Sequence, residues 1–161
     1  LVTVGKAIGS GVPVGAALVA ERVAEKIFAG DHGTTYGGNL LAMRSALYVL
    51  EQLTGTAAAV PYEGGGIIGH VREVGAVFGE RLEGLRAKHA VVQSVRGAGV
   101  MRGLELTTDA QPVVDRALKA GLIVNRIAER VVRMLPPFTV TVAEIDEAVG
   151  ILDQALSVTQ A

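Results

Sequence analysis

The chain has 161 residues, of which half are hydrophobic, and its 15 basic and 16 acidic side chains give a net charge of −1 at pH 7. This balance leaves no electrostatic footprint for nucleic acid, and no apolar run reaches the roughly 20 residues that a membrane-spanning helix needs. The absence of cysteine excludes disulfides and thiolate metal sites and fits a cytoplasmic protein. We therefore expect neither nucleic acid nor membrane as a partner.

The first elements surround a lysine. Residues 1–4 form an apolar, β-branched run that predicts a buried strand, and Lys6 follows it, just before a glycine-punctuated turn over residues 9–15. Burial disfavours the ammonium form of a lysine, and the neutral amine is the form that attacks a carbonyl carbon to make a Schiff base. Lys6 is therefore the leading candidate for covalent chemistry, against the alternative of an ordinary solvated lysine.

The segments that follow alternate between strand-like and helical patterns. A long helix is expected after Asn39, which can serve as its N-cap, and it ends at Gly55, a typical C-cap residue. A connector over residues 57–66 contains Pro61 and three successive glycines, and we place a domain boundary near residue 55. The expected elements of this half are a strand at 14–20, a short helix at 21–28 and the long helix at 40–53.

The second half has strands and helices in mixed order, which is typical of an α+β domain. Thr141 and Glu144 fit the capping box at the start of the last helix. Leu122–Val124 is expected as a short strand. The other expected elements are a helix at 67–87, strands at 91–95 and 100–106, a helix at 112–120 closed by Gly121, a strand at 131–135 and a helix at 141–156.

Several patterns are interpreted as structural. The glycine runs at 9–11 and 97–99 match neither the phosphate-binding pattern G-x-x-x-x-G-K-[ST] nor the dinucleotide pattern G-x-G-x-x-G, so we expect turns there. The histidines have no ligand spacing, and no metal site is expected. The carboxylates at the start of the last helix are expected to complement its dipole. The side chains concerned are His32, His70, His89, Glu144, Asp146 and Glu147.

Two further places combine residue types that bind anions. Thr34 and Thr35 lie in a glycine-rich loop before the helix at residue 40, where hydroxyls and backbone N–H groups either hold a phosphate or simply cap the helix. Arg133 stands between Val132 and Met134 in an apolar strand, so alternation places it on the opposite face. It is either a solvent-facing side chain or a guanidinium that captures a carboxylate through two hydrogen bonds.

Three segments, in this order, resemble motifs of the class III pyridoxal-phosphate-dependent aminotransferases. Residues 3–16 resemble the cofactor-lysine motif, residues 31–39 the phosphate loop and residues 131–137 the substrate-arginine segment. The resemblance covers essentially the whole chain but only the C-terminal part of the family's length. It implies an α/β protein of fold type I, with the end of the large cofactor-binding domain at 1–55 and a small C-terminal α+β domain at 56–161.

The resemblance also implies roles for individual residues. Lys6 would hold pyridoxal phosphate, and Thr34 and Thr35 would contact its phosphate, with Thr35 reaching the cofactor of a neighbouring subunit in a homodimer with shared sites. Arg133 would bind a substrate carboxylate, and Arg96, which also matches a family position, is interpreted as structural. The family usually has proline where this chain has Leu40, a departure that affects the entry into the helix rather than the phosphate contact.

The implied reaction is transamination of N-acetylornithine, or a related ω-amino acid, with 2-oxoglutarate to give the semialdehyde and glutamate in arginine biosynthesis. Related class III enzymes act on ornithine, 4-aminobutyrate or carrier-bound lysine precursors, and an aminomutase shares the lysine. Because residue 1 already lies inside a strand, we also expect a truncated chain. The alternative function is then a catalytically incomplete fragment that lacks much of the cofactor pocket.

Overall fold

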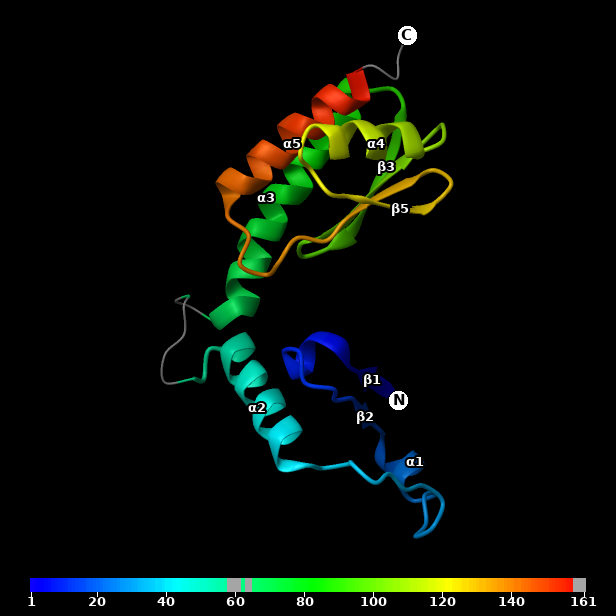
Figure 1. Cartoon of the computed structure of the whole chain (residues 1–161), viewed down its shortest axis with the longest axis vertical. Coiled ribbons are helices and arrows are strands. Elements are labelled where there is room, and N and C mark those ends of the chain that lie inside the picture. The colour runs from blue at the N-terminus through cyan, green and yellow to red at the C-terminus, as the bar shows by residue number, and fades with distance from the viewer. Residues whose placement is uncertain (58–61, 63–64, 158–161) are drawn as a thin grey trace. The chain divides into compact units, whose positions relative to one another are not determined.

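We analysed a computed structural model of the chain, which describes residues 1–57, 62 and 65–157; Pro61 of the expected connector lies outside them. The chain divides into two compact units, Leu1–Gly66 (unit 1) and Ile67–Ala161 (unit 2), drawn from blue to cyan and from green to red in Figure 1. Each unit is described by itself below. The domain boundary near residue 55 stays a prediction.

Unit 1 contains a short β-ribbon followed by helices. Strand β1 (Val2–Val4) pairs antiparallel with β2 (Ala16–Leu18), and the 3-10 helix η1 (Lys6–Gly9) lies between them in the chain. Helix α1 is a single turn, Glu21–Ala24, shorter than the expected 21–28. The chain turns after it because the carboxylate of Asp31 accepts a hydrogen bond from the backbone N–H of Phe28 at 2.8 Å.

The expected burial of residues 1–4 is wrong for this chain. Val2 is 59% exposed and Leu18, its partner across the ribbon, is 56% exposed. The reason is that β1 pairs only with β2, in a two-stranded sheet of three residue pairs, and no described element covers the ribbon. The β-branched pattern predicted the strand correctly, but burial depends on what packs against a strand.

Helix α2 (Leu40–Thr54) begins and ends as its sequence predicts. The side chain of Asn39 accepts a hydrogen bond from the backbone N–H of Ala42 at 2.9 Å, and Gly55 adopts a left-handed conformation with φ 76° at the C-cap. The start of the helix is therefore fixed by Asn39, although proline is missing at position 40. The apolar side chains of α2 that set its helical spacing are exposed: Leu40, Met43, Leu47 and Leu50.

Unit 2 is built on a four-stranded antiparallel sheet with the order β3-β4-β6-β5. Strands β3 (Val92–Ala98) and β4 (Met101–Leu106) form one hairpin, and β5 (Asn125–Ala128) and β6 (Val131–Met134) form another. Leu104, Leu106 and Val132 alternate with polar residues along their strands and are fully buried. One face of the sheet therefore belongs to the core.

Two strand assignments differ from the expectation. β3 runs through residues 96–98, which were expected as a loop, because Gly97 has φ 122° and lets the backbone stay paired where a Cβ would lie 2.0 Å from the oxygen of Met101. Leu122–Val124 is not a strand; β5 starts at Asn125. Ala128 pairs with Val131 across a two-residue turn, and an irregularity between Arg126 and Ala128 then shifts the register so that Asn125 pairs with Arg133.

Three helices cover the core side of the sheet. They are α3 (Gly66–Lys88), α4 (Gln111–Lys119) and α5 (Val142–Ser157), close to the expected bounds, and α4 is followed by Gly121 with φ 91°. The capping box of α5 is confirmed: the Glu144 carboxylate accepts from the backbone N–H of Thr141 at 2.8 Å, and the Thr141 hydroxyl accepts from the N–H of Glu144 at 3.3 Å.

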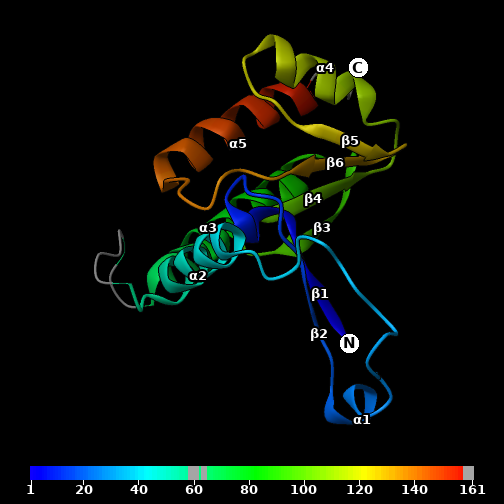
Figure 2. The same ribbon diagram turned by 60° about the horizontal axis from the view of Figure 1, so that its bottom comes forward.

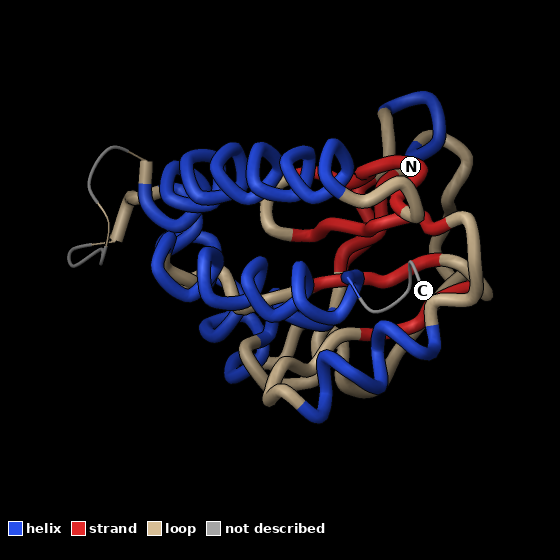
Figure 3. The backbone as a smooth tube through the Cα atoms, turned by 90° about the horizontal axis from the view of Figure 1, so that it is seen from above, coloured by secondary structure: helices blue, strands red, loops and turns tan. Residues whose placement is uncertain are grey.

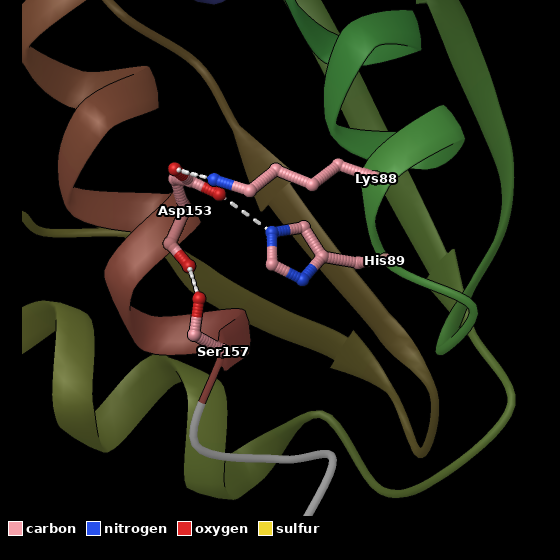
Figure 4. A network of polar contacts seen from close by, with 4 residues as sticks. All are labelled: Lys88, His89, Asp153 and Ser157. Atoms are coloured by element: carbon pink, nitrogen blue, oxygen red, sulfur yellow. Dashed lines mark hydrogen bonds and ion pairs between the residues drawn. The ribbon is translucent and has the colours of Figure 1, made fainter.

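Helices α3 and α5 run side by side and in the same direction (Figure 1). Arg81 of α3 donates to Asp146 of α5 at 2.8 Å, and Lys88, at the end of α3, donates to Asp153 at 2.6 Å. Buried His89 contacts the other oxygen of Asp153 at 2.6 Å (Figure 4). The carboxylate of Asp153 thus joins the end of α3 to α5.

None of the helices in the described ranges combines the length and the hydropathy that a membrane crossing needs. Figures 2 and 3 show the helices and strands from two further directions.

Candidate active site

Lys6 lies at the first position of η1, directly after β1, and its backbone is unusual. Its φ is 54°, in the left-handed region that residues other than glycine rarely adopt, and Ser10 at the end of the turn has φ 47°. Such a conformation costs on the order of 1–3 kcal/mol and is found preferentially at functional sites. The candidate lysine is therefore held in a strained turn.

Packing against α2 holds this turn in place. The hydroxyl of Ser45 on α2 donates to the backbone oxygen of Gly9 at 2.6 Å. Gly9 is buried, and a Cβ there would lie 2.6 Å from Cγ1 of Val14, so only glycine fits without a shift. A helix that starts 34 residues further along the chain thereby fixes the position of the Lys6 backbone.

The expected desolvation of Lys6 is wrong for this chain, since its side chain is exposed. The expectation depended on a buried β1, and β1 itself is exposed. The amine is accessible to a ligand from outside the chain.

A cavity of about 350 Å³ lies between the phosphate-loop segment, the turn before β2 and the start of α2. Gly37 and Gly38 line it; a Cβ on Gly37 would lie 2.3 Å from Cγ2 of Thr34, and Gly38 has φ 69° with open space where its Cβ would be. The full lining is Pro13, Val14, Gly15, Thr34, Tyr36, Gly37, Gly38, Asn39, Ala42 and Met43.

This cavity has the chemistry of an anion site. The cavity lies at the first turn of α2, where the helix dipole adds a partial positive charge, and the N–H groups of its lining residues Ala42 and Met43 already donate to Asn39. Thr34 adds a hydroxyl to the lining, and the glycines keep the backbone accessible. A phosphate group matches these donors in charge and hydrogen-bonding capacity.

The structure brings Thr34 to the cavity but neither Thr35 nor Lys6, which are exposed and absent from its lining. The amine and the anion cavity of one chain are therefore distinct sites on unit 1.

Arg133 lies on β6 in unit 2, on the face of the sheet opposite the core. Its neighbours Val132 and Met134 are buried, as alternation predicts, but Arg133 itself is only partly exposed. One terminal nitrogen of the guanidinium, Nη2, donates to Oδ1 of Asn125 at 3.1 Å. Nε is buried and has no hydrogen-bond partner among the described residues. A buried donor in this state costs about 1–3 kcal/mol.

A row of paired residues crosses this face of the sheet at Arg133. Arg96 pairs with Gly103, Gly103 with Arg133, and Arg133 with Asn125. Arg96 forms an ion pair with Glu105, which also accepts from the Ser94 hydroxyl at 2.8 Å. These contacts fit the structural role expected for Arg96.

In contrast, Arg133 forms no ion pair with any residue that the structure describes. The sheet therefore presents one cation already neutralised by a carboxylate and one cation open to a carboxylate from a ligand. The planar fork of the open guanidinium suits such a ligand.

The described surroundings of the histidines do not resemble a metal site. His89 is buried against Asp153, and a ring nitrogen of His70 lies 3.0 Å from the backbone oxygen of Val140. Within the ranges 1–57 and 65–157, no cluster of three or more His, Asp or Glu side chains is arranged to hold a metal ion. Asp146 and Glu144 take part in the ion pair and the capping box described above.

Comparison with known proteins identifies the family. The model of the class III aminotransferases matches residues 1–156, and the chain belongs to this family. Its members depend on pyridoxal phosphate. The chain is 40% identical, over 158 residues, to acetylornithine aminotransferase of Caldanaerobacter subterraneus, and this match covers 98% of the chain and 38% of the relative. It is also 40% identical to the mitochondrial acetylornithine aminotransferase of Neurospora crassa, covering 96% of the chain and 32% of that protein.

Solved structures support the fold. Ornithine δ-aminotransferase of Plasmodium falciparum matches with a TM-score of 0.82 at 26% identity, covering 97% of this chain and 39% of that one. The α/β class and the fold-type I relationship predicted from the motifs are confirmed. The chain spans less than two fifths of the length of these relatives.

Three residues that shape the candidate sites were not found from the sequence. Ser45 anchors the lysine turn, Asn125 holds Arg133, and Gly103 lies beside Arg133 in the sheet. Asn125 gave no signal, because a regular two-residue turn at residues 129–130 would pair position 125 with position 134, and an irregularity between Arg126 and Ala128 shifts its partner to Arg133. Ser45 gave no signal, because its contact joins positions 36 residues apart.

Proposed function

We propose that this chain carries the cofactor lysine and the substrate arginine of a pyridoxal-phosphate-dependent aminotransferase that acts on N-acetylornithine or a related ω-amino acid, with 2-oxoglutarate as the amino acceptor. The observation that carries the proposal is the strained turn at Lys6 within the family's lysine motif: its amine is accessible, and Ser45 of α2 donates to the turn at the backbone oxygen of Gly9. The proposal includes the formation of glutamate, a role in arginine biosynthesis and a location in the cytoplasm.

The residues present fit the cofactor. Lys6 Nζ supplies a primary amine for the aldehyde, and the cavity at the start of α2 offers the Thr34 hydroxyl and the positive end of the helix dipole for the phosphate. When bound, pyridoxal phosphate supplies an electron sink for the carbon that bears the amino group. Lys6 would hold the cofactor and, once a substrate amine has replaced it, carry the proton to and from that carbon. Arg133 would orient the substrate through its carboxylate.

We also propose a homodimer in which Thr34 and Thr35 of one subunit serve the phosphate of the cofactor held by Lys6 of the other. Two findings support this arrangement. Thr34 lines the anion cavity of its own chain, and Lys6 of the same chain does not. In addition, unit 1 exposes large apolar side chains such as Phe28 and Tyr36, at 68% and 80%. An interface between copies would bury such side chains.

Residues 1–55 would then be the end of a large cofactor-binding domain, and residues 56–161 a small domain. A second candidate is a chain that is catalytically incomplete by itself. The exposure of Lys6 and of β1 favours this candidate, because a desolvated amine and a covered ribbon are what efficient chemistry at Lys6 needs. We expect weak cofactor binding and no appreciable turnover from the 161 residues alone.

The two candidates are separated by absorption spectroscopy and a glutamate assay on the purified chain with added pyridoxal phosphate. A visible absorption band that Lys6→Ala removes, together with turnover, supports the complete enzyme. A weak band that depends on Lys6, without turnover, supports the incomplete one. A band of equal strength in wild-type chain and Lys6→Ala contradicts the proposed role of the lysine, and Lys26→Ala is the matched control.

A further inference from the structure

We propose that Asn125 is a positioning residue for Arg133, and that Gly103 leaves beside Arg133 the space in which a carboxylate of the amino-acid or oxo-acid substrate binds. The inference rests on the proposed function, because it adds the groups that make Arg133 a usable carboxylate site. It is carried by three observations on the face of the unit 2 sheet that points away from the core.

The first observation is how the guanidinium is held. Nη2 donates to Oδ1 of Asn125 at 3.1 Å, and Asn125 and Arg133 are direct partners between β5 and β6. An amide oxygen accepts a hydrogen bond without adding a charge, so Asn125 orients the fork and leaves its positive charge available. An aspartate at this position would neutralise the charge instead.

The second observation is the unsatisfied donor. Nε of Arg133 is buried and has no partner among the described residues, although buried polar atoms normally have one. Nε and the terminal nitrogens are the donors with which arginine makes two parallel hydrogen bonds to a carboxylate. The guanidinium is therefore anchored on one side and still has donors for a ligand.

The third observation is the space next to it. Gly103 pairs with Arg133 from β4, so the two residues share one face of the sheet. A Cβ at Gly103 would meet only Val131 Cγ1 at 3.5 Å and the oxygen of Val132 at 3.8 Å, which are ordinary contacts. The fold itself does not require glycine at this position, since φ of Gly103 is outside the left-handed region. The absence of a side chain therefore leaves space beside Arg133 that a ligand can use.

Neighbouring charges favour the same site. Glu105 lies on the same face of the sheet. Its carboxylate already forms an ion pair with Arg96 and accepts a hydrogen bond from the hydroxyl of Ser94. Because of these contacts Glu105 neither pairs with Arg133 nor presents a free carboxylate to repel the ligand. A carboxylate bound over Gly103 would lie between two arginines, one neutralised and one open.

The test is a titration of the ¹⁵N-labelled 161-residue chain with glutarate, followed through the Nε–H signal of Arg133 in NMR spectra and assigned by its loss in Arg133→Lys. Neutral glutaramide is the control ligand. We expect a saturable shift with glutarate, a dissociation constant about tenfold higher in Asn125→Ala, and one about a hundredfold higher in Asn125→Asp. The absence of a saturable shift in the wild-type chain overturns the inference.

Asn125→Asp separates positioning from a structural role. Aspartate keeps the acceptor and forms an ion pair with Arg133, so it should preserve stability while it neutralises the charge that binds the ligand; glutarate binding is unchanged only if Arg133 does not bind the carboxylate. Our proposal predicts full stability with the weakest binding of the series. Glutarate affinity in Asn125→Asp equal to that of the wild-type chain would refute it.

Gly103→Ala provides a second test of the proposal, at the space beside Arg133. We expect an unchanged melting temperature, because the added Cβ makes only ordinary contacts, and a glutarate affinity reduced by about tenfold or more through overlap with the ligand. Unchanged affinity would contradict the assigned space. The titrations contain no cofactor, so the lysine chemistry plays no part in them. Failure of the lysine chemistry and failure of this inference are therefore distinguishable.

Discussion

The two units bury their apolar side chains to very different extents. Within the described residues of unit 1, Ala42 is the only fully buried hydrophobic side chain, whereas the core of unit 2 draws on three helices and on strands β3, β4 and β6. The candidate amine and the anion cavity lie in the unit with the sparse core, and the candidate carboxylate site lies on the well-packed one.

This difference separates two ways of holding a functional side chain. Arg133 is fixed by a sheet register that unit 2 stabilises by itself, so its geometry does not depend on other surfaces. Lys6 is fixed by a strained turn with one side-chain anchor, Ser45, on a unit whose ribbon is exposed. We therefore expect the site on unit 2 to persist in the isolated chain and the site on unit 1 to need further covering.

The largest effect is expected from truncating the core of unit 2. Leu104→Ala removes a fully buried side chain and should lower the free energy of unfolding by about 3 to 4 kcal/mol, measured by urea denaturation. Leu47→Ala, at a position 48% exposed on α2, should change it by no more than about 0.5 kcal/mol. Equal effects of the two substitutions would show that the units do not differ as described.

A smaller effect is expected at the contact of α3 with the β3–β4 turn. A Cβ at Gly75 would lie 2.7 Å from backbone atoms of Gly99, so Gly75→Ala should destabilise the chain by about 1 to 3 kcal/mol. Gly84 in the same helix has open space around it, and Gly84→Ala should stabilise by about 0.5 to 1 kcal/mol. Thermal unfolding of both variants measures the contrast, and a stabilising Gly75→Ala contradicts the close approach.

Asp153 should make the stability of unit 2 depend on pH. Hydrogen bonds from Lys88 and then His89 lower the pKa of Asp153 below its ordinary value. Because the folded pKa is below the unfolded one, this contribution is complete above the unfolded pKa of about 3.9 and is lost as the pH falls through the folded pKa. Asp153→Asn should cost about 1 to 2 kcal/mol at pH 7.

The measurement is the urea midpoint of wild-type chain and Asp153→Asn between pH 7 and pH 2. The difference between them should shrink as the pH falls below 4. Asp146→Asn, which removes a more exposed ion pair on the same helix, should cost less than about 1 kcal/mol. A difference between wild type and Asp153→Asn that is constant over this range contradicts the assigned network.

The smallest effect is expected at the start of α2. Asn39→Ala removes the N-cap and should cost about 1 kcal/mol, expressed as faster amide hydrogen exchange in the first turn of α2. Because unit 1 has little core, we expect this loss to remain local and to leave exchange in the unit 2 sheet unchanged. Faster exchange in unit 2 would argue against independent units.

The sequence predicted best where structure follows from local pattern. The helix expected at 67–87 is present as α3, whose Val74, Phe78 and Leu82 are buried, and Thr141 with Glu144 predicted the start of α5. Family motifs predicted which residues to consider as functional sites. These signals need only residues that are neighbours along the chain.

What the sequence did not predict depends on pairing between distant segments. Val2 looks like a core residue but has only one neighbouring strand, and Leu122 was assigned to a strand that starts three residues later. The contact of Asn125 with Arg133 requires the register of a hairpin, and that of Ser45 with Gly9 requires the packing of a helix on a turn. Neither the spacing of apolar residues along the chain nor the helix and strand propensities of single residues contain this information.

The most direct test of the account traps the lysine. The chain is mixed with pyridoxal phosphate, reduced with borohydride and digested, and the modified lysines are mapped by mass spectrometry. We predict modification concentrated at Lys6 over Lys26, an exposed lysine of the same unit, with the preference reduced in Ser45→Ala because the anchor of the turn is lost. Equal labelling of Lys6 and Lys26 in the wild-type chain would contradict the claim that this turn is built to present a reactive amine.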